Sequence, residues 1–205
     1  MSTLLASGGP VMWLLLIAAA IAAVVFIERA LYCHRSQINS AEFLNGVRTV
    51  IKRGNVVEAI AICDATAGPV ARLVKAAILA RDLGRDRVRE AVEEAGLTEV
   101  PRLEEKLNLL ATIAQIAPLL GLFGTLLGFI DTFGYITHAD AYANFRDLAD
   151  GVGKALVCAA GGIAVAIPAH AGYNYLVSRV NKIVLDMERA AAEIVNIVSE
   201  NGNGK

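Results

Sequence analysis

Three long runs without a charged residue constrain this chain more than any other feature of its sequence. They extend from Gly8 to Ile27, from Leu107 to Ile130 and from Ala155 to Ser178, and a charged residue follows each of them. Crossing the hydrocarbon core of a bilayer takes about 20 residues of α-helix, so each run is long enough. Hydrophobic residues make up 56% of the chain and charged residues 19%, fewer charges than a soluble domain usually carries. The sequence therefore predicts an all-α integral membrane protein with three transmembrane helices.

Basic residues near the ends of these runs predict how the chain is oriented. No Lys or Arg precedes the first run, and Arg146 is the only one within residues 132–153. The opposite ends of the runs carry Arg29, Arg35, Lys106, Arg179 and Lys182. Cytoplasmic flanks of membrane helices are enriched in Lys and Arg, so we expect the N-terminus outside and the C-terminus in the cytoplasm. We also expect the first helix to be retained, because it lacks a basic leader and an A-x-A cleavage pattern.

Together these features divide the chain into six segments. Residues 1–28 contain the first transmembrane helix, 29–106 a cytoplasmic helical segment, 107–131 the second transmembrane helix, 132–154 a periplasmic connection, 155–178 the third transmembrane helix and 179–205 a cytoplasmic helix and tail. Apolar residues recur at helical spacing in the cytoplasmic segment, at Phe43, Val47, Val50 and Ile51 and again at Val70, Leu73, Val74, Ala77 and Ile78. We expect short amphipathic helices there, a charged helix over residues 86–107 that bends near Pro101, and a long helix that continues beyond Ser178.

Composition and motifs exclude several classes of function. A formal net charge of −1 gives no electrostatic basis for binding DNA or RNA, so we expect no nucleic-acid partner. Cys33, Cys63 and Cys158 are scattered and odd in number, so they form neither a disulfide framework nor a CxxC metal site. The sequence pattern offers no nucleophile with a base, no His–carboxylate cluster and no phosphate-binding Gly loop. We therefore expect a protein that is not an enzyme, without catalytic residues, metal or cofactor.

The second and third runs are rich in small residues. Lipid gives helices no hydrophobic drive to associate, and small residues let their backbones approach closely. Two interpretations remain open: tight packing within one chain, or an oligomer in which these two helices line a shared central space. Prolines interrupt the same two runs, which is tolerated where neighbouring helices satisfy the freed backbone groups. The residues on which we expect packing to depend are Pro118, Gly121, Gly124, Gly128, Gly161, Gly162 and Pro168.

Motifs in all three runs are typical of one family. The first run opens with Gly8-Gly-Pro-Val-Met-Trp13 and ends at Ile27-Glu28-Arg29. The second contains Ala117-Pro-Leu-Leu-Gly121-Leu-Phe-Gly124-Thr125, and the third contains Ala164-Val-Ala-Ile-Pro168-Ala before Tyr173-Asn-Tyr. These motifs resemble those of the ExbB/TolQ/MotA stator (proton channel) family, and ExbB most closely.

The resemblance implies a homopentamer in the cell inner membrane, with a periplasmic N-terminus and a cytoplasmic C-terminus. It also implies a single-span ExbD/TolR-like partner, present in two copies inside the pentamer, a TonB-like or other periplasm-spanning protein, and membrane lipid. In that family, ion flow down the proton motive force drives work across the envelope. The expected function is therefore that of a motor subunit whose energy transduction serves outer-membrane transport or integrity.

Two positions depart from the pattern of the family. Members that conduct protons usually carry a glutamate at the start of the third helix and a threonine five residues later, where this chain has Lys154 and Ala159. A second function is therefore open, that of a structural scaffold that keeps the assembly and has lost the ion pathway. The resemblance places Thr125, Lys154 and Ala159 along the pathway, and we expect Thr112 and Gln115, which lie toward the cytoplasmic end, to continue its polar track.

Three of the polar residues have more than one interpretation. Thr125 either faces the central axis or bonds back to a carbonyl one turn earlier. Lys154 either reaches the membrane surface or pairs with Asp150 or Asp131, or it faces the axis and pairs with an acidic group of the partner. His170 is either an interfacial histidine held by a hydrogen bond or a proton relay.

Overall fold

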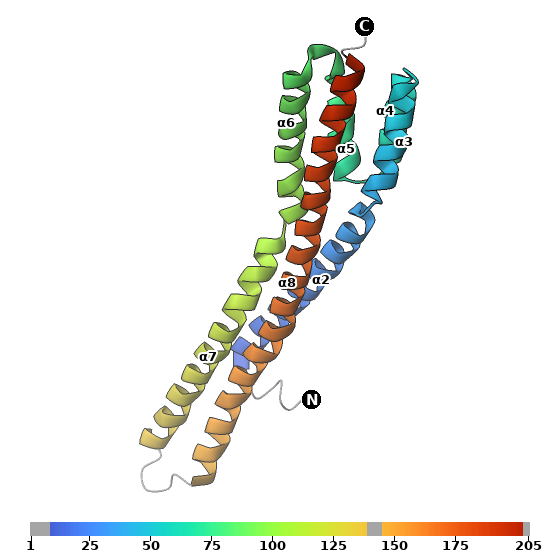
Figure 1. Cartoon of the computed structure of the whole chain (residues 1–205). Coiled ribbons are helices and arrows are strands. Elements are labelled where there is room, and N and C mark those ends of the chain that lie inside the picture. Colours follow the sequence, from blue (N-terminus) through green and yellow to red (C-terminus); the bar gives the residue numbers. More distant parts are fainter. Residues whose placement is uncertain (1–8, 139–144, 203–205) are drawn as a thin grey trace. The chain divides into compact units, whose positions relative to one another are not determined.

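The computed structural model describes residues 9–138 and 145–202, and every regular element within these ranges is a helix. In chain order they are α2 (Gly9–Ser36), α3 (Ser40–Lys52), α4 (Val56–Ala65), α5 (Pro69–Leu79), the short 3-10 helix η1 (Arg81–Leu83), α6 (Arg85–Glu104), α7 (Leu107–His138) and α8 (Phe145–Gly202) (Figure 1). Within the described residues, three helical stretches are long and apolar enough to cross a membrane. The predicted all-α fold with three membrane-crossing helices is confirmed.

The helices are longer than the apolar runs from which they were predicted. Helix α7 continues past Ile130 to His138, and α8 begins at Phe145, well before Ala155. The expected connection over residues 132–154 therefore belongs largely to these two helices, and residues 139–144 lie outside the described part. The reason is physical: an apolar run ends where hydrocarbon ends, whereas a helix continues into water as long as its backbone is hydrogen-bonded.

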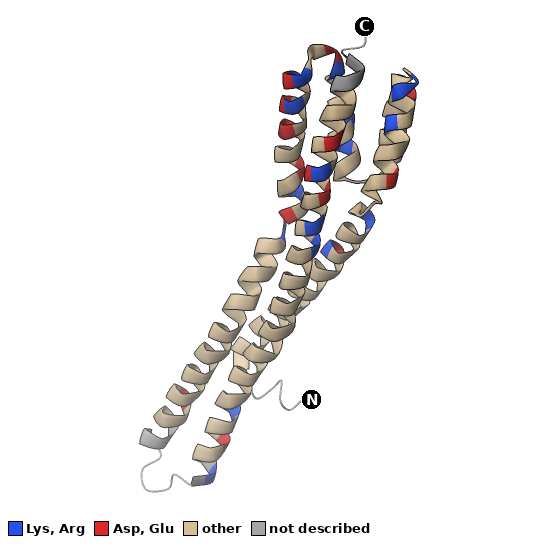
Figure 2. Ribbon diagram, in the orientation of Figure 1, with Lys and Arg blue, Asp and Glu red and all other residues tan. Residues whose placement is uncertain are grey.

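The chain forms two compact units. One, the spanning unit, consists of Met1–Glu28 and Lys106–Tyr175, and the other, the charged unit, consists of Arg29–Glu105 and Leu176–Lys205. Figure 2 shows that acidic and basic residues are dense on α3 to α6, whereas long stretches of α2, α7 and α8 carry none. Helix α2 therefore begins in the spanning unit and ends in the charged unit, and α8 does the same.

The core of the charged unit follows the predicted helical periodicity. Helix α5 buries Val70, Leu73, Val74, Ala77 and Ile78, as its spacing predicts. Helix α3 buries Leu44, Val47, Val50 and Ile51, so Leu44 takes the place expected for Phe43, which is half-buried. Asn39 and Asn55 cap α3 and α4 by accepting from the backbone N–H groups of Glu42 and Glu58. In its C-terminal half α8 buries one stripe, formed by Leu176, Val180, Ile183, Met187, Ala190, Ile194 and Ile197.

The charged helix before the second transmembrane helix ends at residues that the sequence did not mark as a helix end. A bend was expected near Pro101, but α6 continues through Pro101 and ends at Glu104. Glu105 is extended, and Lys106 has a φ of 62°, the left-handed region that a residue with a side chain seldom adopts. The break between α6 and α7 is therefore made by Glu105 and Lys106.

Candidate functional site

Helices α7 and α8 are antiparallel, and their backbones contact each other at glycine residues. A Cβ atom at Gly121 would lie 2.9 Å from the carbonyl oxygen of Cys158 and 3.0 Å from the Cα of Gly162. A Cβ atom at Gly162 would lie 2.6 Å from the carbonyl oxygen of Ala117. These distances leave no room for any side chain, so the two backbones are in direct contact, as small residues permit.

The other glycines extend this contact in both directions. A Cβ atom at Gly128 would lie 2.9 Å from the Cβ of Ala155, and one at Gly124 would lie 3.0 Å from the Cβ of Cys158. Gly161 faces α2 instead, where a Cβ atom would lie 3.3 Å from the Cε of Met12. The glycine faces of α7 and α8 are therefore occupied by helices of the same chain.

Thr125 lies inside this contact. Its hydroxyl lies 2.9 Å from the carbonyl oxygen of Gly121, one turn earlier, and 3.1 Å from the carbonyl oxygen of Ala155 on α8. Only 6% of Thr125 is exposed in the single chain. The hydroxyl therefore makes the back-bond and also links α7 to α8, and a role for Thr125 in lining an ion pathway stays a prediction.

Lys154 directly precedes the third apolar run and is exposed. Its Nζ lies 3.2 Å from a carboxylate oxygen of Asp150 one turn earlier, and the two side chains are 54% and 74% exposed. Asp150 is thus the acidic partner that the single chain supplies. Ala155, which accepts from Thr125, directly follows Lys154, so Lys154 lies next to the link between the two helices.

Of the remaining predicted pathway residues, Ala159 lies against α7 opposite Gly121, whereas Thr112 and Gln115 lie about three turns from Thr125 along α7. Ala159 is half-buried on α8, and Thr112 and Gln115 are exposed on α7 near its Leu107 end. The Thr112 hydroxyl donates to the carbonyl of Asn108, 2.7 Å away. Pro118 is half-buried in α7 and Pro168 is exposed in α8, and both helices continue through them. A single chain therefore does not bring these residues into one continuous polar track.

Sequence analysis missed two ion pairs around the junction of α6 and α7. Arg29, of which 4% is exposed, lies 3.0 Å from Glu105 and donates to the carbonyl oxygen of Arg102. In the spanning unit, Lys106 pairs with Glu28. Each residue of the Glu28-Arg29 dipeptide thus pairs with the oppositely charged residue of Glu105-Lys106. The sequence shows only that each dipeptide places an acidic residue before a basic one, which by itself says nothing about proximity.

A second missed feature is a buried carboxylate in the charged unit. Glu99 on α6 is 4% exposed and pairs with Arg72 of α5 at 2.5 Å and with Arg102 at 3.1 Å. Burying a charge is costly unless it is paired and hydrogen-bonded, and two guanidinium groups satisfy this requirement. Glu99 therefore fixes α5 against α6.

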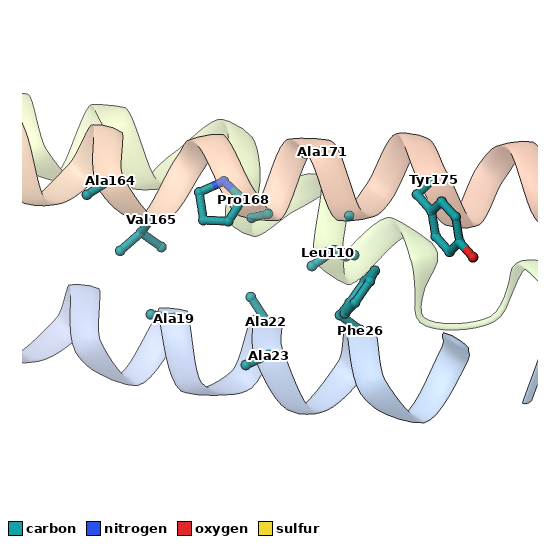
Figure 3. Close-up of a pocket in the computed structure, with 12 residues that line it drawn as sticks. Ala19, Ala22, Ala23, Phe26, Leu110, Ala164, Val165, Pro168, Ala171 and Tyr175 are labelled. Atoms are coloured by element: carbon teal, nitrogen blue, oxygen red, sulfur yellow. The ribbon is translucent and has the colours of Figure 1, made fainter. Parts of the chain in front are cut away.

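An apolar cavity of about 580 Å³ lies within the spanning unit. Figure 3 shows that alanines of α2 and α8 face each other across it, with Phe26 and Tyr175 near one end. Tyr175 is its one side chain with a polar group, and no group of residues in the described part of the chain could hold a metal ion. The lining offers packing surface and no reactive groups.

Comparison with known proteins identifies the architecture. A family model described as the MotA/TolQ/ExbB proton channel family matches residues 65–189, more than half of the chain. The chain belongs to this family. The match contains the α7–α8 contact, Thr125, Lys154 and Ala159.

Individual relatives agree with the family match. The chain is 27% identical to an ExbB homolog of Methanothermobacter thermautotrophicus over 85% of its own length and 62% of that protein. It is 36% identical to the Tol-Pal system protein TolQ of Haemophilus influenzae over 52% of its length and 46% of that protein. An ExbB-like protein of Synechocystis sp. is 32% identical over 78% of this chain and 77% of its own length. The matches thus span less than two thirds of the first two relatives.

Membership of the MotA/TolQ/ExbB family places the structure in a family of membrane proton channels and not of enzymes. The predicted resemblance to ExbB and TolQ is thereby confirmed. Two positions differ from what the resemblance leads us to expect: Lys154 stands where an acidic residue is expected, and Ala159 stands where a threonine is expected. Both lie on α8 within the matched region.

Proposed function

We propose that this chain is the three-span subunit of an ExbB/TolQ-type motor that couples the proton motive force to work across the cell envelope. Five copies surround two copies of a single-span ExbD/TolR-like partner in the inner membrane, with the N-termini in the periplasm and the C-termini in the cytoplasm. The partner, or a TonB-like protein bound to it, carries the work to outer-membrane transport or to envelope integrity.

The observation that carries this proposal is the backbone contact between α7 and α8 within the region of the family match. Gly121 and Gly162 bring the helices together, and the Thr125 hydroxyl links them to the carbonyl of Ala155. Such a contact makes the two spans one rigid pair, which is what a subunit needs if a central partner is to move against it. The glycine faces are used within the chain, so the opposite faces of α7 and α8 remain for neighbouring subunits and for the partner.

A second function is favoured by Lys154. This exposed lysine pairs with Asp150 at the outer end of α8, and Ala159 provides no hydroxyl one and a half turns further on. The exposed pair with Asp150 offsets part of the lysine charge, but it does not replace the acidic residue and the hydroxyl that the resemblance associates with proton conduction. On this account the chain is a scaffold that assembles with its partner and does not conduct.

Reconstitution distinguishes the motor from the scaffold. The chain and its co-expressed partner are placed in liposomes containing a pH-sensitive dye, and a membrane potential is imposed. The motor requires flux in the wild type, whereas the scaffold requires none in the wild type with the partner bound, as native mass spectrometry can show. Flux that appears only in the double variant Lys154→Glu, Ala159→Thr would assign the loss of conduction to these two positions, with Lys182→Glu, which changes an exposed lysine outside the third run, as the matched control that should behave as the wild type. Flux in the wild type would contradict the scaffold, and its absence from a wild-type complex that retains the partner would contradict the motor.

A further inference from the structure

One histidine lies inside the apolar runs and has no place in the pathway described above. Among Asp, Glu, His, Lys and Arg, the three runs contain His170 alone. It lies about 12 Å along the helix before Ser178, at ~1.5 Å per residue. The imidazole is exposed on α8 and has no hydrogen-bond partner within residues 9–138 and 145–202. In the described part of the single chain, His170 is therefore not the interfacial histidine held by a hydrogen bond that was one of its two interpretations.

His170 lines a groove of about 490 Å³ in the spanning unit. The groove is formed by Ala114 of α7 and by Ala166, Ile167, His170, Ala171 and Asn174 of α8. Asn174 follows His170 by one turn and is exposed on the same side of α8. Two polar side chains thus project into a groove whose other walls are alanine and isoleucine.

Among the described residues, no charged side chain lines this groove. The ring of Tyr173 is the titratable neighbour on α8, with its centroid 6.4 Å from that of His170. The charges of the described spanning unit lie toward its ends, with Glu28 and Lys106 at one end and Asp131, Asp150 and Lys154 at the other. The remaining surroundings of the imidazole are therefore set by the medium that fills the groove.

The polar side chains indicate that this medium is not hydrocarbon. Gln115, next to Ala114 on α7, is exposed at a similar depth and, like His170 and Asn174, has no hydrogen-bond partner in the described part of the chain. Polar groups without partners are costly in lipid, and ionisable residues within spans face water-filled or protein-lined space. The face bearing Gln115, His170 and Asn174 therefore turns away from the lipid.

We propose that His170 is a proton-binding site of this chain, in a water-filled groove open toward the cytoplasmic end of the α7–α8 face. A ring nitrogen of the neutral imidazole accepts a proton from hydronium, leaving water, and the imidazolium returns that proton to another water molecule. Imidazole is suited to this exchange because it changes charge near neutral pH. The inference rests on the proposed conduction and names the residue of this chain that carries the proton at the cytoplasmic end.

Cysteine accessibility tests the groove without reference to conduction. His170→Cys and Asn174→Cys, in the assembled complex with the native cysteines replaced by alanine, are treated from the cytoplasmic side with a charged methanethiosulfonate reagent. Ile21→Cys, exposed on α2 at a comparable depth, is the control. We expect labelling at residues 170 and 174 at least tenfold faster than at residue 21. Equal labelling of all three would overturn the proposal, because the groove would then be filled by lipid or protein.

Proton flux tests the role of the imidazole itself. His170→Gln should lower flux at least tenfold with the partner still bound. The control His34→Gln, which changes an exposed histidine outside the runs, should leave flux within twofold of the wild type. His170→Glu should conduct better than His170→Gln, because a carboxylate also exchanges protons. Wild-type flux that His170→Gln leaves unchanged would overturn this inference and leave the proposed function standing. If the wild type carries no flux, the proposed function fails and the inference fails with it. If His170→Gln does not assemble, His170→Glu and the labelling decide, and a His170→Glu complex without flux would contradict the proposal.

Discussion

Gly162 of α8 lies so close to α7 that a Cβ atom there would come within 2.6 Å of the carbonyl oxygen of Ala117. The atoms that such a Cβ would meet on α7 all belong to its backbone, so the contact cannot be relieved by a change of rotamer. The α7–α8 pair is therefore the least adaptable part of the spanning unit, and substitutions in it give the clearest tests of the structure.

The first prediction concerns this contact. Gly162→Ala should destabilise the chain by about 1–3 kcal/mol, the usual cost of overpacking, because the added methyl must push the helices apart. Thermal unfolding in detergent measures it, with a fall in Tm of ~2–4 °C for each kcal/mol. Gly153→Ala is the control, because nothing lies within 4 Å of a Cβ there and alanine favours the helix. A Gly162→Ala chain as stable as Gly153→Ala would contradict the contact.

The second prediction concerns the hydroxyl that links the two helices. Thr125→Val keeps the shape of the side chain and removes the hydroxyl that donates to the carbonyl oxygen of Ala155. We expect a loss of about 1 kcal/mol, whereas Thr125→Ser, which keeps the hydroxyl, should lose less. Flux of the reconstituted complex is the second measurement. Flux that falls in Thr125→Val and returns in Thr125→Ser would support a place in the pathway, and flux equal in both would restrict Thr125 to packing.

The third prediction concerns Glu99 in the charged unit. Glu99→Ala removes the acceptor shared by Arg72 and Arg102, whose side chains are 47% and 58% exposed and can regain water. The expected loss is therefore about 1–3 kcal/mol, below that of a fully buried pair. Glu90→Ala, which breaks the exposed pair with Arg87, should cost less than ~1 kcal/mol. Similar denaturation midpoints for the two variants would show that burial of Glu99 has no energetic consequence.

The fourth prediction concerns the pH dependence of thiol reactivity. Burial, together with the neighbouring Asp64 charge, raises the pKa of the Cys63 thiol to about 11, although Lys75 acts in the opposite direction. The thiolate is the reactive form, so alkylation of Cys63 should be slow at pH 8 and should increase only as the pH approaches about 11. Ala61→Cys, an exposed position on α4, is the comparison and should react readily at pH 8. Rapid reaction of Cys63 at pH 8 would contradict its burial.

The fifth prediction concerns Lys154. Its pair with Asp150 is exposed, so Lys154→Ala should change the free energy of unfolding by less than ~1 kcal/mol. If the lysine also pairs with an acidic group of the partner, Lys154→Ala should reduce the amount of partner that co-purifies and leave the pentamer intact, because that carboxylate is left uncompensated. Unchanged partner retention and unchanged flux would make Lys154 an interfacial residue that only extends to the membrane surface.

The sequence was sufficient for features that depend on composition and local spacing. The apolar runs predicted α2, α7 and α8, and the periodicity from Val70 to Ile78 predicted the buried face of α5. Helix ends were less predictable, because α7 and α8 extend beyond the hydrocarbon into sequence of ordinary polarity.

Contacts between particular helices could not be predicted from the sequence. The small residues at Gly121 and Gly162 predicted a close approach, but they could not say whether the neighbour belongs to the same chain. The pairing of Arg29 with Glu105 joins residues far apart in the chain, and no local pattern marks it. The break at Lys106 was missed for a related reason, since Pro101 is the stronger local signal and yet lies within α6.

The most direct test of the central claim is the proton flux carried by the wild-type chain with its co-expressed single-span partner. Liposomes containing the complex, the chain alone or neither are given a membrane potential, and internal pH is followed with a trapped dye. The motor account predicts acidification with the complex at a rate well above that of empty liposomes, and much less with the chain alone. A complex that retains its partner and acidifies no faster than empty liposomes would contradict the account.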